Sequence, residues 1–305
     1  MKQLLILSGK GGTGKTTVAG AFIKLGKAKA FADCDVDAPN LHLIMQDLTE
    51  PERRDYYGMK KAVIDPNRCI ACGRCRAHCR FGAIDHYPGN PLNRQYQVNP
   101  YACEGCGVCE RICPEEAITL KPYIAGELRL YNEAATFSTA ELKMGSGTSG
   151  LLVTEVKKQL TDGVRKKDGV EDTEIAIIDG SPGIGCPVIA SISGVDMTLV
   201  VAEPSISGIS DMKRILETAK KFGVETAVCV NKYDTNEENT KKIEAFCREH
   251  RIHFFGKIPY DPLAVKAIND MQSIAEVDCP SGAAVKEVFQ RTMKTLLNES
   301  EEALS

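Results

Sequence analysis

The sequence of 305 residues lacks a long apolar run, an excess of basic residues and histidines spaced as metal ligands. Its apolar runs are only a few residues long, whereas a helix that spans a bilayer needs about 20 apolar residues. The formal net charge is −3, so the basic footprint of a nucleic-acid-binding protein is absent. We therefore expect neither a membrane span nor a nucleic-acid partner.

The N-terminus also lacks an export signal, because its apolar stretch Leu4–Leu7 runs directly into a glycine-rich loop. We therefore expect a cytoplasmic protein. Between residues 283 and 297, apolar residues recur at helical spacing, which is typical of either a membrane-surface helix or a packed final helix. The acidic residues that follow would repel anionic lipid, so we expect the packed helix and no stable membrane anchor.

Cysteine, in contrast, is abundant. Eight of the thirteen cysteines lie between Cys69 and Cys113, where a C-x2-C-x2-C-x3-C pattern recurs after 34 residues. In a reducing compartment this pattern favours metal binding over disulfides. A two-fold repeat this short indicates a pseudo-symmetric module in which each half covers the apolar face of the other.

The repeat resembles the bacterial ferredoxins that hold two [4Fe–4S] clusters, over roughly residues 62–121. In that pattern the fourth cysteine of each half ligates the cluster of the other half. The resemblance implies that cluster 1 uses Cys69, Cys72, Cys75 and Cys113, and that cluster 2 uses Cys103, Cys106, Cys109 and Cys79. Zinc is the main alternative, but zinc sites typically use pairs of C-x2-C rather than triplets.

The two halves differ after the fourth cysteine, where the second half has the expected Pro114 and the first half has Arg80. Between Lys60 and Lys121 there are nine Lys and Arg residues and six Asp and Glu residues. We expect this mildly basic charge to offset part of the negative charge of the clusters.

A phosphate-binding loop lies near the N-terminus. Residues 9–16, GKGGTGKT, fit the pattern G-x-x-x-x-G-K-[ST] between an apolar strand and a helical pattern. Glycines let backbone N–H groups surround phosphate oxygens at a helix N-terminus. We expect Lys15 to reach the β- and γ-phosphates and the Thr16 hydroxyl to ligate Mg²⁺. The loop residues predicted to bind the nucleotide are Gly11, Gly12, Thr13, Gly14, Lys15, Thr16 and Thr17.

Apolar strands alternate with helical patterns on both sides of the cysteine repeat. Strands are predicted at 4–7, 29–32, 175–178, 197–202, 227–230 and 252–258, and helices at 18–25, 151–160, 209–222 and 236–250. The alternation predicts an α/β fold with a mostly parallel sheet and helices on both faces. We predict a P-loop domain formed by residues 1–57 and 122–305, with an α+β ferredoxin-like domain inserted at 58–121.

The string KGGTGKTT at residues 10–17 resembles the deviant phosphate loop of the MinD/ParA superfamily, which includes the nitrogenase iron protein and Mrp-type cluster carriers. The likeness extends over residues 1–50 and 140–270. It implies an ATPase that dimerises face to face over MgATP. It also implies that Lys10 contacts phosphates, often across the dimer, as an added cation where charge develops.

The same resemblance assigns three aspartates. Asp33 and Asp35 end the second strand, where the first switch of the family begins. Asp35 would orient the attacking water and contribute to the Mg²⁺ site, and Asp33 would support Mg²⁺ or the loop. Asp179 ends a strand before Gly-Ser-Pro-Gly at 180–183, which resembles the second switch, and would hold Mg²⁺ through water.

The sequence motifs indicate the identity of the nucleotide base less directly. Residues 231–234, NKYD, fit the guanine-reading pattern N-K-x-D. In the family resembled here, however, an asparagine at the place of Asn231 usually contacts adenine, and a segment like that around Pro259 lines the other side. The resemblance therefore implies ATP rather than GTP.

Five cysteines lie outside the repeat. Cys229 and Cys247 fall in strand and helix patterns and are expected in the core, as is Cys34, whereas Cys279 is assigned only as a candidate surface thiol. Cys186 follows Asp179 by seven residues, the offset of a cluster-binding cysteine in the nitrogenase iron protein. Cys186 therefore has two interpretations, a transient metal or cluster site and a buried thiol.

Two functions fit these motifs best. The first is an ATPase that couples its nucleotide state to electron transfer through two clusters. The second is an Mrp-type carrier or scaffold that delivers an iron–sulfur or mixed-metal cluster to an apo-protein. A positioning ATPase is a third hypothesis, disfavoured by the acidic C-terminus and the absence of a basic surface. The expected partners are a second copy or a similar paralogue, and a redox or cluster-accepting protein.

Overall fold

The computed structural model describes residues 1–45, 48–86, 96–166 and 174–298, and the chain divides into two compact units. The first unit comprises Met1–Arg53, Arg129–Ala140 and Gly150–Ser305. The second comprises Arg54–Leu128 and Glu141–Ser149, so it contains the predicted module 58–121 and extends past it on both sides.

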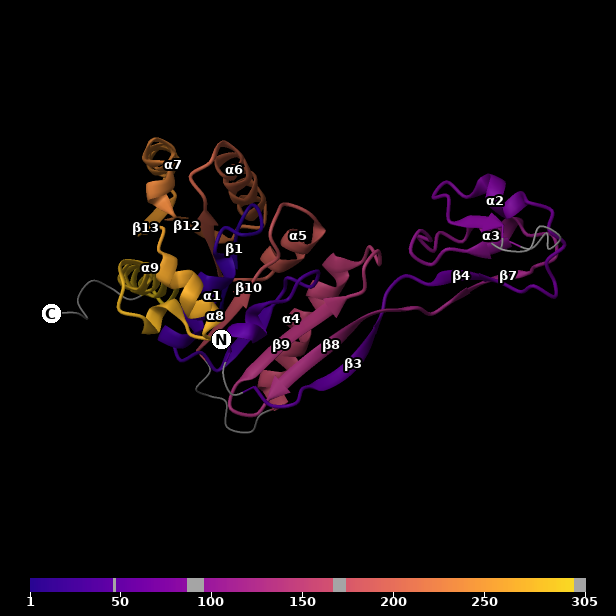
Figure 1. Cartoon of the computed structure of the whole chain (residues 1–305), viewed down its shortest axis with the longest axis horizontal. Helices are drawn as coiled ribbons and strands as arrows, with labels where there is room; N and C mark the ends of the chain where they lie inside the picture. Colours follow the sequence, from indigo (N-terminus) through magenta and orange to yellow (C-terminus); the bar gives the residue numbers. More distant parts are fainter. Residues whose placement is uncertain (46–47, 87–95, 167–173, 299–305) are drawn as a thin grey trace. The chain divides into compact units, whose positions relative to one another are not determined.

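The main sheet has nine strands in the order β13-β12-β11-β1-β10-β2-β9-β8-β3 (Figure 1). The strands are β1 (Lys2–Leu7), β2 (Ala30–Asp33), β3 (Glu52–Tyr57), β8 (Ile124–Asn132), β9 (Thr136–Leu142), β10 (Ile175–Asp179), β11 (Met197–Ala202), β12 (Glu225–Asn231) and β13 (His253–Ile258). All neighbours from β13 to β9 are parallel. Only three residues join β8 to β9, which requires an antiparallel pair. The predicted mostly parallel α/β fold is confirmed.

Five of the six predicted strands lie inside the sheet, where strands buried on both faces are apolar throughout, and the sixth, β13, is an edge strand. Leu4, Leu5, Ile6 and Leu7 of β1, for example, are fully buried. The prediction missed β3, β8 and β9. The sequence of β3 is ERRDYY, and five of its six side chains are exposed, so it carries no apolar run. An edge strand of this kind does not have the pattern of a buried strand.

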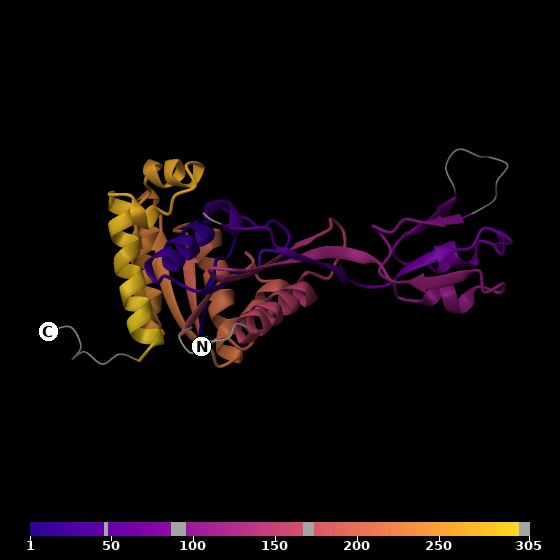
Figure 2. The same ribbon diagram turned by 90° about the horizontal axis from the view of Figure 1, so that it is seen from below.

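Helices cover both faces of the sheet. They are α1 (Lys15–Leu25), α4 (Ser149–Lys166), α5 (Cys186–Ile192), α6 (Ile206–Lys221), α7 (Glu237–Glu249), α8 (Pro262–Asn269) and α9 (Pro280–Leu296), with short turns η1 (Leu41–Ile44), η3 (Tyr233–Thr235) and η4 (Ile274–Glu276). Right-handed crossovers place α4, α5, α6 and α7 on one face and α1 on the other, because the strand order reverses at β1. In Figure 2, the indigo α1 and the yellow α9 lie on one side of the sheet and the pink α4 on the other.

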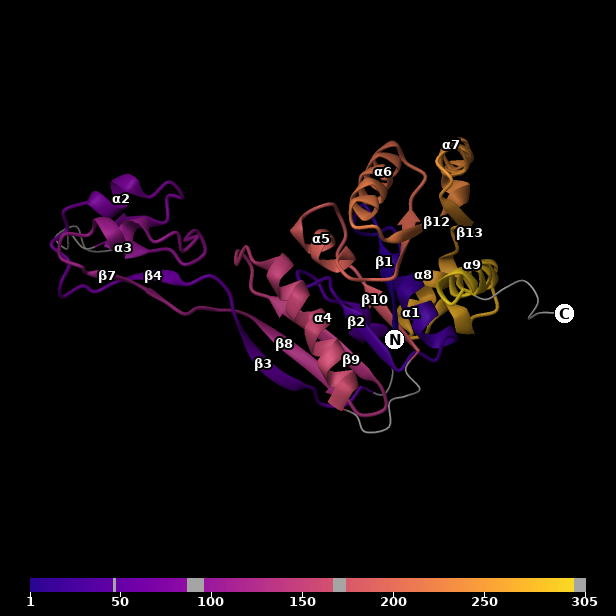
Figure 3. The same ribbon diagram turned by 180° about the vertical axis from the view of Figure 1, so that it is seen from behind.

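The final helix packs into the core, as expected. Val285 and Val288 of α9 are 1% exposed, and Phe289 meets Phe22 of α1 edge to face, with ring centroids 5.1 Å apart. On the other face, Lys157 of α4 donates hydrogen bonds to the carbonyl oxygens of Ser191 (2.8 Å) and Ser193 (2.6 Å) at the end of α5, and Figure 3 shows the two helices side by side. Within the described ranges, no helix is both long enough and apolar enough to cross a membrane.

The second unit shows the two-fold repeat in three dimensions. Its elements are β4 (Lys61–Ile64), α2 (Arg74–His78), β5 (Ile84–His86), β6 (Tyr96–Val98), α3 (Val108–Ile112) and β7 (Ile118–Lys121). The antiparallel pairs are β4 with β7 and β5 with β6, so each half contributes one strand to each pair. The helices α2 and α3 each follow a glycine with a left-handed backbone, Gly73 (φ 75°) and Gly107 (φ 79°).

We predict that Phe22→Ala lowers the free energy of unfolding of the first unit by about 3–5 kcal/mol, because it leaves a cavity beside Phe289 in a closed core. Chemical denaturation followed by circular dichroism would measure it. Phe222→Ala is the matched control, since that ring is 46% exposed, and it should change stability by no more than about 0.5 kcal/mol. Equal losses in both variants would contradict the assignment of Phe22 to the core.

Candidate functional site

A cavity of about 660 Å³ lies in the first unit where the carboxyl ends of the parallel strands meet. This volume is typical of small-molecule sites, and this edge of an open α/β sheet is where ligands bind. Of the predicted site residues, the following line the cavity: Lys10, Gly11, Gly12, Thr13, Gly14, Lys15, Thr16, Thr17, Asp35, Asn231 and Pro259. The buried Asp33 and Asp179 are not among its lining residues.

Asp179 ties the phosphate loop to the end of β10. Its carboxylate forms an ion pair with Lys15, with 2.5 Å between Nζ and Oδ1, and accepts a hydrogen bond from the Thr16 hydroxyl at 2.7 Å. Burial acts to lower the pKa of Lys15, but the Asp179 carboxylate outweighs it, and the pKa is raised. A bound phosphate would therefore compete with Asp179 for the ammonium group of Lys15.

Asp33 holds the segment that follows β2. Its two carboxylate oxygens accept hydrogen bonds from the backbone N–H groups of Asp35, Asn40 and Leu41, each at 2.9 Å. Burial, with the charge of Asp179, raises its pKa to about 7, although Lys15 and these hydrogen bonds act in the opposite direction. Of its two predicted roles, this geometry matches support of the loop, and a role toward Mg²⁺ stays a prediction.

Asp35 differs from Asp33 because it is partly exposed and faces the cavity. Burial raises its pKa to about 6, which the charge of Lys15 partly offsets. The carboxylate is thus placed where it can act on a ligand in the cavity, and its protonation state changes slightly below neutral pH.

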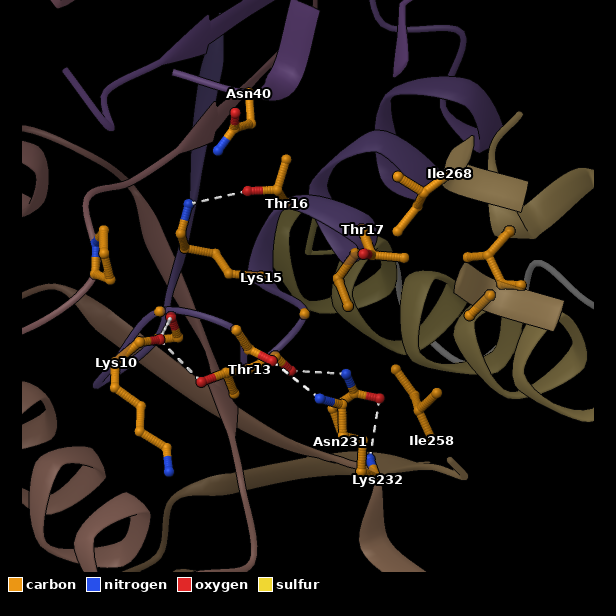
Figure 4. Close-up of a pocket in the computed structure, with 18 of the residues that line it drawn as sticks. Lys10, Thr13, Lys15, Thr16, Thr17, Asn40, Asn231, Lys232, Ile258 and Ile268 are labelled. Carbon is orange, nitrogen blue, oxygen red and sulfur yellow. Dashed lines mark hydrogen bonds between the residues drawn. The ribbon is translucent and has the colours of Figure 1, made fainter. Parts of the chain in front are cut away.

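The side chain of Lys10 points away from Lys15 and Thr16 (Figure 4). Its ammonium group pairs with Glu203 at the end of β11, with 3.0 Å between Nζ and Oε2. Its carbonyl oxygen accepts hydrogen bonds from the hydroxyls of Ser8 and Thr13, both at 2.9 Å, which fix the loop backbone. The predicted contact of Lys10 with phosphates therefore requires its release from Glu203.

The loop after β12 is bonded directly to the phosphate loop (Figure 4). Asn231 Nδ2 donates to the carbonyl oxygen of Thr13 at 2.7 Å, and Lys232 Nζ donates to that of Gly12 at 2.9 Å. The contact of Lys232 was not predicted. Asp234, the last residue of the N-K-x-D match, does not line the cavity and accepts a hydrogen bond from the backbone N–H of Tyr260 at 2.8 Å. Its carboxylate is thus already engaged.

One wall of the cavity is apolar. It includes Ile258 and Pro259 after β13 and Val265 and Ile268 of α8. Only Pro259 was predicted from the sequence. The apolar spacing in Pro262–Asn269 is a signal that could have identified α8, but nothing in that pattern indicates that the helix faces the cavity rather than the core.

The eight repeated cysteines line two hollows in the second unit. The first hollow is lined by Cys69, Cys72, Cys75 and Cys113, and the second by Cys79, Cys103, Cys106 and Cys109. The structure thus brings together the members of each predicted ligand set, three cysteines from one half and one from the other.

The fourth cysteines occupy equivalent environments. Cys79 Sγ accepts a hydrogen bond from the backbone N–H of Ala83 (3.4 Å), and Cys113 Sγ accepts one from that of Ala117 (3.3 Å). Burial raises the pKa of Cys109 to about 11, and the charges of Cys103 and Cys106 act in the same direction. In the described part of the chain, no three His, Cys, Asp or Glu side chains are arranged to hold one metal ion.

The remaining cysteines are mostly packed. Cys34, Cys229 and Cys247 are buried, as expected. Cys279, a candidate surface thiol to which the sequence assigns no role, is also buried: its Sγ accepts a hydrogen bond from the N–H of Gly282 and caps α9. Cys186 is exposed at the first residue of α5, which excludes the buried thiol, and its metal role stays a prediction.

Residues 4–274 match the CbiA family, the CobQ/CobB/MinD/ParA nucleotide binding domain. The chain belongs to this family. Its structure agrees, since that of septum site-determining protein MinD from Pyrococcus horikoshii, complexed with Mg-ADP, superposes with a TM-score of 0.53 over 98% of this chain and 99% of that chain. Because the two sequences are only 16% identical, this likeness shows that the two chains share a fold and nothing more.

Two full-length relatives are uncharacterized proteins of Methanocaldococcus jannaschii. One is 31% identical over 95% of both chains, and the other is 28% identical over 87% of this chain and 90% of its own. A shorter match, 31% identical over 61 residues, involves 20% of this chain and 65% of the PorD subunit of pyruvate synthase from Methanothermobacter marburgensis. A third protein of the same organism, an uncharacterized ATP-binding protein, is 25% identical over 93% of this chain and 85% of its own length.

The predicted role of Asp35 requires an ionised carboxylate, so we predict that kcat/KM for MgATP falls as the pH drops below about 6, by about tenfold per pH unit. The raised pKa means that the carboxylate is present above pH 6 and protonated below it. Initial rates of phosphate release between pH 5 and 8 would measure this. Asp35→Asn should lose both the activity and this pH dependence, and a variant that keeps the wild-type profile would contradict the assignment.

Proposed function

We propose that this chain is a MinD-like ATPase that binds and hydrolyses MgATP as a dimer and couples its nucleotide state to electron transfer through two [4Fe–4S] clusters. The observation that carries the proposal is the combination of the nucleotide cavity with two hollows, each lined by four cysteines, in one chain. The family supports the ATPase, and the cysteines support the electron-transfer role.

The cysteine sets fit iron–sulfur clusters better than zinc. Zinc sites typically use pairs of C-x2-C rather than triplets. Each hollow is instead lined by one C-x2-C-x2-C triplet and the fourth cysteine of the other half, which is the ligand pattern of two [4Fe–4S] clusters. When bound, such clusters accept and release single electrons at potentials that the surroundings set. We assign cluster 1 to Cys69, Cys72, Cys75 and Cys113, and cluster 2 to Cys79, Cys103, Cys106 and Cys109.

The nucleotide site fits MgATP in a similar way. Lys15 and the loop N–H groups would hold the phosphates, and Thr16 and Asp179 would face Mg²⁺ once Lys15 turns to the phosphates. Asp35 would orient the attacking water. Lys10, released from Glu203, would supply a further cation, and Asn231 and Pro259 would flank adenine.

The contacts between the two switch segments give nucleotide binding a route to the rest of the chain. The backbone N–H of Cys34 donates to the carbonyl oxygen of Asp179 at 2.7 Å, and the Ser181 hydroxyl donates to that of Cys34 at 2.5 Å. A movement of Asp179 away from Lys15 therefore acts on both segments. The segment after Asp33 leads along the chain into β3, which enters the second unit. Loops held by a γ-phosphate and relaxed by hydrolysis are a common switch.

A cluster carrier is the second candidate. The exposed thiol of Cys186 at the start of α5 favours it, since a transfer site must be accessible. Two relatives in one organism make a heterodimer with a paralogue as reasonable as a homodimer. The further partner would be a redox protein or a cluster-accepting apo-protein, and a cytoplasmic location is part of the proposal.

We predict about eight iron and eight sulfide per chain after anaerobic purification, which is the content of two [4Fe–4S] clusters. Binding of a slowly hydrolysed MgATP analogue should shift the potential or the EPR line shape of at least one cluster. Lys15→Ala should keep the iron and lose this response, because it removes the phosphate contact but no cluster ligand. If neither the potential nor the EPR line shape of either cluster changes when the analogue binds, the result contradicts coupling between nucleotide and clusters and favours the cluster carrier.

We also predict that ATP binds more tightly than GTP, because Asp234 is engaged by the backbone of Tyr260 and does not line the cavity. Competition of unlabelled ATP and GTP against a fluorescent ATP analogue, at fixed Mg²⁺, would measure the preference. Tighter binding of GTP would show that residues 231–234 read guanine after all.

A further inference from the structure

Lys61, on β4 of the second unit, is a buried lysine outside the nucleotide site. Its relative exposure is 6%, and lysine is almost never fully buried unless it is paired. The other charged side chains that are buried in the described part of the chain are Lys15, Asp33 and Asp179. Those three lie together and compensate one another, with Lys15 in an ion pair with Asp179.

The surroundings of Lys61 satisfy its hydrogen-bonding capacity only in part. Its Nζ donates to the backbone carbonyl oxygen of Cys103 and lies 5.6 Å from the centroid of the Tyr123 ring. Among the residues that the structure describes, none forms an ion pair with it. An ammonium group has three donors, and neutral partners leave its charge uncompensated. Such burial is costly unless an anion is near.

The carbonyl group that Lys61 contacts belongs to the first cysteine of the second triplet. Cys103 lines the second hollow with Cys79, Cys106 and Cys109. A cysteine ligates metal as the thiolate, so a cluster held by these four side chains carries negative charge. A cluster held by these four side chains would therefore supply the missing counter-charge of Lys61.

The two halves of the repeat differ in whether they carry a lysine at this position. At the corresponding position, 34 residues after Lys61, the sequence has the neutral Gln95. A second lysine, Lys143, lies 6.0 Å from the centroid of the same Tyr123 ring, but it is exposed, so water screens its charge. Lys61 thus distinguishes cluster 2 from cluster 1.

We propose that Lys61 is the charge-compensating residue of cluster 2: its ammonium group positions the backbone of Cys103 and stabilises the reduced, more negative state of the cluster held by Cys79, Cys103, Cys106 and Cys109. The proposal rests on the two-cluster function proposed above. Because net charge near a cluster sets its potential, Lys61 makes cluster 2 easier to reduce than it would be beside a neutral residue.

The test uses the full-length chain, purified without oxygen, in four variants. Lys61→Met removes charge and donor, Lys61→Gln keeps a donor without charge, and Lys61→Arg keeps both. Lys143→Met is the matched control over the same ring. Iron and sulfide analysis gives the cluster content, and an EPR-monitored redox titration gives the two midpoint potentials.

We expect Lys61→Met and Lys61→Gln to make one of the two clusters harder to reduce by at least tenfold in the one-electron equilibrium, which corresponds to about 59 mV, and to leave the other unchanged. Lys61→Arg and Lys143→Met should titrate like the wild type. If Lys61→Met loses half of its iron while Lys61→Arg keeps all of it, the result also supports compensation of one cluster.

Three results would overturn the proposal. Wild-type potentials in a fully loaded Lys61→Met protein would show that the charge does not act on a cluster. If the midpoint potentials of Lys61→Gln equal those of the wild type while one potential of Lys61→Met is shifted, the role of Lys61 is limited to its hydrogen bond with Cys103. A wild-type protein without iron and sulfide would remove the two-cluster function itself, and the iron analysis separates this outcome from the other two.

Discussion

The ion pair between Lys15 and Asp179 is the interaction on which the nucleotide site depends. Parallel strands bring the start of α1 and the end of β10 to one edge of the sheet, and the pair forms there at 2.5 Å, almost out of water. A charge buried at such a place must have a partner. Lys15 is thus neutralised by the same carboxylate that the resemblance implies for Mg²⁺, and a phosphate bound there would replace this counter-ion.

The same requirement organises the neighbouring segments. Asp33 is buried beside this pair, and it gathers the backbone N–H groups of Asp35, Asn40 and Leu41 around its carboxylate. The main chain of Cys34 is bonded to that of Asp179. Both segments are thus bonded to residues of one buried charged group, and this is the physical basis of the proposed nucleotide-dependent switch.

In the second unit the organising constraint is the pairing of the two halves. The antiparallel pairs β4–β7 and β5–β6 join one half to the other, so the fourth cysteine of each half reaches the hollow of its partner half. Each hollow is therefore lined by three cysteines from one half and one from the other. A buried cation needs an anion nearby, as Lys15 shows. For Lys61, which is buried beside Cys103, the proposed cluster 2 would be that anion.

The sequence by itself determined the central strands, the phosphate loop and the two cysteine sets. In each, the signal is local: an apolar run, a glycine pattern or a fixed spacing of cysteines. It did not determine β3, β8 and β9, because exposed residues in β3, partly exposed residues in β8 and buried polar residues in β9 interrupt the apolar run. Only the tertiary structure decided that Lys232 holds Gly12, that Asp234 is engaged by Tyr260, that Cys279 is buried and that Lys61 lies beside Cys103. Each of these contacts joins residues from separate segments of the chain, and burial and charge compensation are properties of the packed three-dimensional environment, which residue order alone does not specify.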